Sequence, residues 1–140
     1  MEAAEKELGA EYRPLEELLG ESDFVSLHVN LSDETHGMIG SHEFEIMKPT
    51  AVLINTARGP IVDREALYDA LKENKIAYAA LDVTNPEPLP STDKLLSLPN
   101  IIIAPHIASA TVTSRTKMCM MAVENLVAGL KGEALPFPVN

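Results

Sequence analysis

Short apolar segments alternate with helix-patterned segments along most of the chain, which predicts an α/β fold. The clearest apolar run, residues 51–55, is rich in branched side chains and predicts a strand buried on both faces. A helix is expected from residue 64 to about residue 73, because Asp63 is a good N-cap and apolar residues follow it at helical spacing. Further strands are expected at residues 9–12, 24–29, 77–83 and 101–104.

One long helix and several short helices are expected in the rest of the chain. A long helix is expected over residues 111–131, and Gly132 suits its C-terminus. Shorter helices or helical turns are expected at residues 2–8, 14–19, 41–47 with Ser41 as its cap, and 93–98. Strands that alternate with helices imply a parallel sheet with right-handed crossovers, as in doubly wound α/β folds.

Composition narrows the possible partners. The 140 residues suffice for one domain, and a net charge of −10 argues against nucleic acid or an anionic membrane as a partner. The chain has neither a long apolar run nor a basic N-terminus, so we expect no membrane span or secretory signal and a cytoplasmic protein. Its single cysteine, Cys119, excludes an intrachain disulfide and is expected to be a small core residue.

Three successive strand ends each carry one side chain that could take part in catalysis. Arg58, Glu87 and His106 follow the strands expected at residues 51–55, 77–83 and 101–104. The carboxyl ends of parallel strands share one edge of the sheet, so the three could converge there. Arg58 would then hold a carboxylate, His106 would transfer a proton, and Glu87 would hold the imidazole and favour its charged form. Taken singly, each has a simpler interpretation as a loop or surface residue.

Three segments that contain these residues resemble the D-isomer-specific 2-hydroxyacid dehydrogenases, and within them the glyoxylate/hydroxypyruvate reductases. The segments are Asn-Thr-Ala-Arg-Gly-Pro-Ile-Val-Asp at 55–63, Leu-Asp-Val-Thr-Asn-Pro-Glu-Pro-Leu at 81–89, and Pro-His-Ile-Ala-Ser-Ala-Thr at 105–111. They occur in the family's order, and the resemblance covers essentially the whole chain. It implies a partial doubly wound (Rossmann-like) parallel sheet with a long C-terminal helix.

The resemblance also implies roles for particular residues. Arg58, Glu87 and His106 match the family's catalytic residues, and Asp82 matches an aspartate that helps place the nicotinamide amide. The residues expected to bind the cofactor are Val29, Asn30, Thr56, Ala57, Arg58, Asp82, His106 and Ala108. Those expected to bind substrate are Arg58, His106 and Ser109, and no metal is expected. Asn30 stands where the family commonly has proline, and Ala108 where it often has glycine.

The activity implied by the resemblance is reduction of a small 2-oxo acid, glyoxylate or hydroxypyruvate, to a D-2-hydroxy acid by NADH or NADPH. The choice between NAD and NADP stays open, because the loop that would read the ribose is not in the sequence. A phosphoglycerate dehydrogenase would share the same three motifs. A non-catalytic protein-interaction module on this fold is a further alternative. The complete protein is expected to be a homodimer.

Two parts of such an enzyme are missing from the sequence. No Gly-x-Gly-x-x-Gly fingerprint occurs, and there is no separate substrate domain. Residues 1–140 are therefore interpreted as the C-terminal part of a nucleotide-binding domain plus its C-terminal helix. The strand at residues 24–29 would then have an open edge, prone to pair with another chain. We expect these 140 residues alone to be marginally stable or self-associated, to bind a dinucleotide weakly, and to be inactive.

Overall fold

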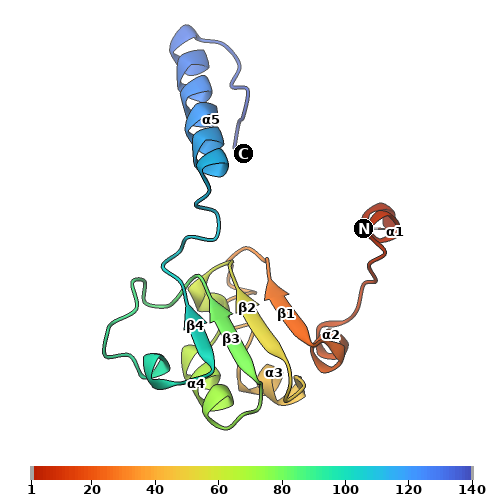
Figure 1. Cartoon of the computed structure of the whole chain (residues 1–140). Helices are drawn as coiled ribbons and strands as arrows, with labels where there is room; N and C mark the ends of the chain where they lie inside the picture. The colour runs from red at the N-terminus through yellow and green to blue at the C-terminus, as the bar shows by residue number, and fades with distance from the viewer. Residues whose placement is uncertain (1, 140) are drawn as a thin grey trace. The chain divides into compact units, whose positions relative to one another are not determined.

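Four parallel strands form one sheet, and their spatial order follows their order in the chain (Figure 1). The computed structural model describes residues 2–139. They form two units, one ending at Pro105 and the other beginning at His106. The strands, all in the first unit, are β1 (Phe24–Leu27), β2 (Val52–Asn55), β3 (Tyr78–Leu81) and β4 (Ile101–Ile103).

The strands therefore match four of the five predicted segments, each shorter than expected. The strand predicted at residues 9–12 is wrong, because this stretch is irregular and pairs with no other strand. The Tyr12 backbone N–H donates to Glu5 Oε1 at 3.0 Å, a side-chain partner in place of a neighbouring strand.

Five α-helices and two 3₁₀ turns are present in the described residues. They are α1 (Glu2–Leu8), α2 (Leu15–Glu21), α3 (Ser41–Ile46), η1 (Gly59–Ile61), α4 (Arg64–Lys72), η2 (Lys94–Ser97) and α5 (Val112–Lys131). The predicted cap of α4 is confirmed, since Asp63 Oδ1 accepts from Ala66 N–H at 2.9 Å. The cap predicted for α3 is wrong. Ser41 is its first helical residue, and the capping contact runs from the Gly40 N–H to Glu43 Oε2 at 2.9 Å.

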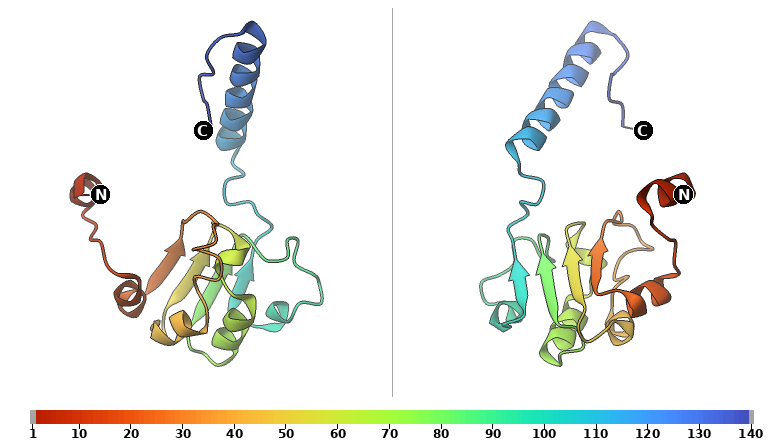
Figure 2. Two further views of the ribbon diagram at one scale, coloured as in Figure 1. Left: turned by 180° about the vertical axis from the view of Figure 1, so that it is seen from behind. Right: turned by 45° about the vertical axis from the view of Figure 1, so that its right-hand side comes forward.

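One face of the sheet forms the core of the first unit. Val25, Leu53 and Ala79 lie side by side in register on this face, and all three are buried. Helices α3 and α4 lie against the same side of the sheet (Figure 2) and add Phe44 and Leu67 to the core. Burial of each large apolar side chain stabilises the fold by about 1.5–3 kcal/mol.

The opposite face of the sheet is exposed within the first unit. Phe24 is 71% exposed, and Ile102 on the other edge strand is 66% exposed. Burial of β2 on both faces was therefore a wrong prediction for this unit. Helix α2 packs on α3 and α3 packs on α4, and both α3 and α4 lie on a single side of the sheet (Figure 2). Among the described residues β1 pairs with β2 alone, so its other edge is open as expected.

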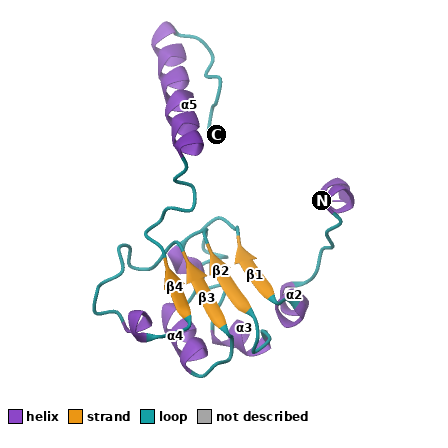
Figure 3. Cartoon of the chain, in the orientation of Figure 1, coloured by secondary structure: helices purple, strands orange, loops and turns teal. Residues whose placement is uncertain are grey.

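The second unit begins with residues 106–111 and continues with α5 and the segment that follows it. Gly132 ends the helix in the left-handed conformation (φ 71°), which confirms the predicted C-terminus. The tail then returns along α5 (Figure 3), and Asn125 binds the Phe137 backbone through both its amide atoms, at 2.7 and 2.9 Å. Cys119 is exposed, so its assignment to a core is wrong within this unit. None of the described helices is long and apolar enough to cross a membrane.

Candidate active site

The loops that follow β1, β2 and β3 leave the sheet at the same edge, because the strands are parallel and in register. Leu27, Asn55 and Leu81 are register partners at that edge. The segments that continue from them are residues 28–31, 56–58 and 82–90. The first unit therefore brings together three loops that carry most of the residues predicted for the site.

Two of these loops enclose a groove with a volume of about 410 Å³. Its lining residues are His28, Val29, Asn30, Leu31, Thr56, Ala57 and Arg58. Five of them belong to the residues predicted to bind the cofactor. His28 and Leu31 were not predicted, and the His28 ring is held by a 2.8 Å hydrogen bond between its Nε2 and Ser26 Oγ.

The groove wall that carries Arg58 is fixed from beneath by Asn55. This side chain is almost completely buried at the end of β2. Its Nδ2 donates to the Arg58 carbonyl oxygen at 2.9 Å, and its Oδ1 accepts from the Ala57 N–H at 3.0 Å. Because a buried amide is costly unless it is hydrogen-bonded, Asn55 and the arginine loop stabilise each other's positions.

The arginine loop also contacts the loop after β3. A Cβ added to Gly59 would lie 2.0 Å from the Thr84 carbonyl oxygen and 2.8 Å from the Asn85 nitrogen. Real side chains never approach backbone atoms so closely, so only glycine fits at this position. The glycine that follows Arg58 thus allows direct backbone packing between the loop of Arg58 and the loop of Glu87.

Local contacts order the loop that carries Glu87. Thr84 Oγ1 donates to the Pro86 carbonyl oxygen at 2.8 Å, and the Thr84 N–H donates to Glu87 Oε2 at 3.5 Å. The peptide bonds that precede Pro86 and Pro88 are both cis. Asp82, at the start of the same loop, is buried, and its N–H donates to the Asn55 carbonyl oxygen at 2.9 Å.

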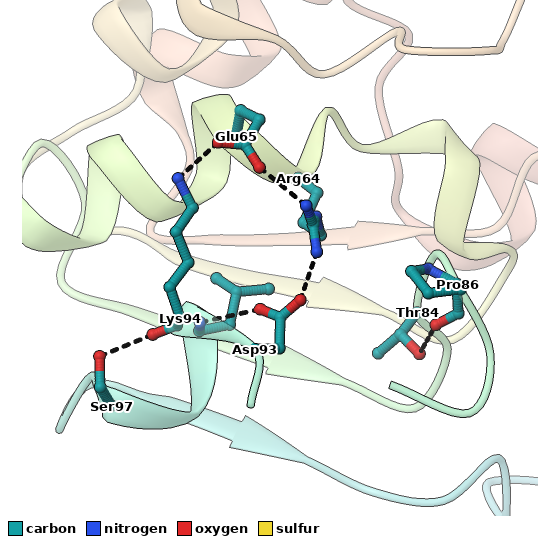
Figure 4. A network of polar contacts seen from close by, with 8 residues as sticks. Arg64, Glu65, Thr84, Pro86, Asp93, Lys94 and Ser97 are labelled. Atoms are coloured by element: carbon teal, nitrogen blue, oxygen red, sulfur yellow. Dashed lines mark hydrogen bonds and ion pairs between the residues drawn. The ribbon is translucent and has the colours of Figure 1, made fainter. Parts of the chain in front are cut away.

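Ion pairs tie the far end of this loop to α4 (Figure 4). The Arg64 guanidinium binds the buried carboxylate of Asp93, which also caps η2 by accepting from the Leu95 N–H. Lys94 binds Glu65 and lies 4.0 Å from the centroid of the Tyr68 ring. The loop that carries Glu87 is therefore anchored at both ends. Gly59 packs on Thr84 near its start, and Arg64 binds Asp93 after its proline-rich centre.

Two groups of this network have shifted pKa values. The hydrogen bond from Lys94 lowers the pKa of Glu65 below its ordinary value of 4.5. The same hydrogen bond raises the pKa of Lys94 above its ordinary value of 10.5. Both side chains lie in solvent, so their mutual attraction is screened.

The other predicted residues, His106, Ala108 and Ser109, belong to the second unit. Their convergence with Arg58 and Glu87 therefore stays a prediction. His106 adopts a left-handed backbone conformation with φ 54°, which is uncommon outside glycine. Such conformations concentrate at functional sites. No group of side chains in the described residues is suited to hold a metal ion.

The sequence of this chain matches a known family over most of its length. The family described as "D-isomer specific 2-hydroxyacid dehydrogenase, NAD binding domain" matches residues 1–108. The chain belongs to this family. The resemblance inferred from the three motifs is thereby confirmed, as is the parallel sheet with a C-terminal helix.

Among curated relatives, the chain is 57% identical to a glyoxylate reductase from Korarchaeum cryptofilum. The match extends over 136 residues, which are 97% of this chain and 41% of the relative. It is 48% identical over 130 residues to a mouse glyoxylate reductase/hydroxypyruvate reductase, covering 93% of this chain and 40% of that protein. The chain thus spans about two fifths of the length of these relatives.

Solved structures of other proteins have a similar fold. The TT0316 protein from Thermus thermophilus superposes with a TM-score of 0.90 at 50% identity, over 94% of this chain and 42% of that one. D-lactate dehydrogenase with NAD+ from Lactobacillus jensenii gives a TM-score of 0.86 at 35% identity, over 97% of this chain and 45% of that one.

Sequence reasoning did not assign a role in the site to Asn55 or Gly59. Asn55 opens the Asn-Thr-Ala-Arg-Gly-Pro motif, and a polar residue at the end of an apolar strand was the available signal. Gly59 lies in the same motif, but its close contact with Thr84 joins residues 25 positions apart and has no local signature.

Proposed function

We propose that this chain forms the C-terminal part of an NAD(P)-dependent D-2-hydroxyacid dehydrogenase that reduces glyoxylate or hydroxypyruvate. The observation that carries the proposal is the groove whose wall includes Arg58 and four other residues expected to bind the cofactor. Its support is the 57% identity to a glyoxylate reductase over nearly the whole chain.

The groove is suited to part of a dinucleotide. Its volume of about 410 Å³ lies within the range of small-molecule sites, at the strand ends where open α/β sheets bind ligands. Val29, Asn30, Thr56 and Ala57 would hold the cofactor there. When bound, NADH or NADPH supplies the hydride for the reaction.

The residues of this chain would then position the substrate and provide the proton. Arg58 binds the carboxylate of the 2-oxo acid through two parallel hydrogen bonds and offsets its charge. His106 donates a proton to the carbonyl oxygen, which becomes the hydroxyl of the product. Glu87 pairs with the imidazole and favours its protonated form.

The remaining features of the proposal concern assembly and location. The complete enzyme is a homodimer that acts in the cytoplasm and binds no nucleic acid, in keeping with a net charge of −10. The 140 residues alone lack the glycine-rich fingerprint, so we expect them to be inactive.

Activity is tested in a chimera. The full-length glyoxylate reductase of Korarchaeum cryptofilum receives this chain in place of its matching region, which is 136 residues long. We expect the chimera to reduce glyoxylate and hydroxypyruvate with NADH or NADPH. His106→Gln should lower kcat by about 10²–10⁴-fold, the usual contribution of a general acid. Arg58→Lys should raise KM for both acids, because lysine cannot form the paired hydrogen bonds of a guanidinium.

Matched variants outside the site provide the controls. His36→Gln and Arg13→Lys change exposed residues of the same types and should leave both parameters unchanged. A folded chimera that reduces neither acid with either cofactor would contradict the proposal and favour a non-catalytic interaction module. Turnover of 3-phosphohydroxypyruvate alone would favour a phosphoglycerate dehydrogenase.

A further inference from the structure

Asn55 is the polar exception in an apolar layer of the core. Its register partners on the neighbouring strands are Leu27 and Leu81, and Ile103 follows on β4. An apolar side chain would suit this layer, yet the position holds an amide that is 1% exposed. Both of its hydrogen bonds go to the arginine loop, so this loop accounts for the presence of the amide.

The two hydrogen bonds of the Asn55 side chain bind the backbone of Ala57 and Arg58, and the Ala57 backbone in turn contacts the Arg58 guanidinium. Asn55 Oδ1 binds the N–H of Ala57, and the carbonyl oxygen of Ala57 accepts from Arg58 Nη1 at 2.6 Å. Asn55 Nδ2 binds the Arg58 carbonyl oxygen on the other side of the arginine Cα. The amide therefore restrains the backbone on both sides of the Arg58 side chain.

We propose that Asn55 is a positioning residue that sets the orientation of the Arg58 guanidinium toward the substrate carboxylate. The proposal rests on the function proposed above and deepens it. Asn55 does not line the groove, and it acts through Arg58. A displacement of about 1 Å at such a site lowers the rate by about a hundredfold.

Asn100 provides a matched control. It is also a buried asparagine beside the sheet, and its Nδ2 donates to the carbonyl oxygens of Leu71 and Ala77 at 3.1 and 3.2 Å. It directly precedes β4, at the opposite edge of the sheet from the groove. If buried asparagines only support the fold here, the two positions should behave alike.

The test compares Asn55→Leu with Asn100→Leu in the chimera. Leucine suits the apolar layer around residue 55. Ala57 is half-buried and Arg58 is exposed, so solvent can reach the arginine loop and satisfy its freed backbone groups. We expect Asn55→Leu to lower kcat/KM for glyoxylate by about a hundredfold. Asn100→Leu should lower the melting temperature at least as much and change kcat/KM by less than about twofold.

A double-mutant cycle with Arg58→Lys separates positioning from general damage. Because Asn55 acts through the guanidinium, Asn55→Leu should lower kcat/KM for glyoxylate by less than about threefold in the Arg58→Lys background. An equal loss in both backgrounds would overturn the proposal, as would full activity of a folded Asn55→Leu enzyme. If Asn55→Leu fails to fold, Asn55→Asp is used in its place. Aspartate keeps the shape of asparagine and the oxygen that accepts from the Ala57 N–H, and the same two outcomes would overturn the proposal.

Hydrogen exchange on the 140-residue chain tests the contact without any activity. The Ala57 amide should be protected in the native chain and exchange at least about tenfold faster in Asn55→Leu. An unprotected Ala57 amide in the native chain would overturn the positioning role. Protection together with an inactive unmutated chimera would instead contradict the proposed function and leave Asn55 as a support of the loop.

Discussion

Gly59 packs directly on the backbone of Thr84, and there is no space between them for even one methyl group. The distance from a Cβ on Gly59 to the Thr84 carbonyl oxygen would be 2.0 Å. Since Gly59 follows Arg58, and Thr84 lies three residues before Glu87, this contact sets how near the two predicted catalytic loops can come.

Gly59→Ala is therefore expected to separate the two loops and to destabilise the fold. The colliding atoms belong to the backbone, which cannot rotate away as a flexible side chain can. We expect the free energy of unfolding to fall by about 1–3 kcal/mol, as in other overpacked sites. Urea unfolding of the 140-residue chain measures this change.

Gly20→Ala provides the control for this prediction. Gly20 lies in α2, and the nearest atom to its added Cβ would be Ile46 Cγ2, at a relaxed 3.7 Å. Alanine at this helical position should be neutral or stabilising by up to about 1 kcal/mol. Equal effects of the two substitutions would show that the Gly59 contact is unimportant.

The elements that the sequence predicted well are those with local patterns. The helix α4 was expected from Asp63 and the spacing of its apolar residues, and both its cap and its range are close to the prediction. Gly132 ends α5 for an equally local reason, because glycine readily adopts a positive φ. The strand ends that place Arg58 and Glu87 follow from the parallel topology.

Features that depend on distant contacts were missed or wrong. The strand expected at residues 9–12 has a plausible pattern but no neighbouring strand with which to pair. Cys119 lies in an apolar helical run, yet burial depends on what covers the helix, and the tail of the second unit leaves it exposed. The Gly59–Thr84 contact depends on how two loops pack and leaves no trace in either segment alone.

Asp93→Asn is predicted to loosen the loop that carries Glu87. Asparagine is as good an N-cap as aspartate, so the contact with Leu95 should survive while the ion pair with Arg64 is lost. The Asp93 side chain is only 2% exposed, so its charge interaction is poorly screened. We expect a loss of about 2 kcal/mol in the free energy of unfolding, measured by urea denaturation.

Asp23→Asn is the matched change at an exposed ion pair. Asp23 binds Lys48 at 3.0 Å, but its side chain is 69% exposed, and such pairs contribute less than about 1 kcal/mol. Proteolysis should also become faster within residues 84–92 in Asp93→Asn and not in Asp23→Asn. Unchanged cleavage in both proteins would mean that Arg64 does not anchor this loop.

The pH dependence of stability should reflect the contact between Glu65 and Lys94. The lowered pKa of Glu65 means that its contribution is present above pH 4.5 and is lost as the pH falls through its folded-state pKa. The raised pKa of Lys94 means that its contribution is complete below pH 10.5 and is lost as the pH rises through its folded-state pKa. The pair therefore stabilises the fold between these limits.

Glu65→Gln tests this dependence. The difference in unfolding free energy between the native chain and the variant should be constant from about pH 6 to about pH 9 and should shrink in acid. Added salt should reduce it, since both groups are exposed. A difference that grows on acidification would contradict the assigned direction of the Glu65 shift.

The open edge of the sheet, and the face that is bare within the first unit, predict that the 140-residue chain self-associates. β1 lies at the edge with Phe24 exposed on the uncovered face, and exposed apolar edges readily pair with other chains. Phe24→Lys should weaken this association, because a charged side chain on an edge strand opposes pairing with a second sheet. Sedimentation velocity over a range of concentrations measures the association of both proteins.

Leu8→Lys separates an effect of the sheet from an effect of added charge. Leu8 is as exposed as Phe24, but it lies at the end of α1 and outside the sheet. We expect Leu8→Lys to associate like the native chain and Phe24→Lys to shift toward monomer. A native chain that sediments as a monomer at all concentrations would show that an open strand edge and an apolar sheet face are insufficient for pairing in this fold.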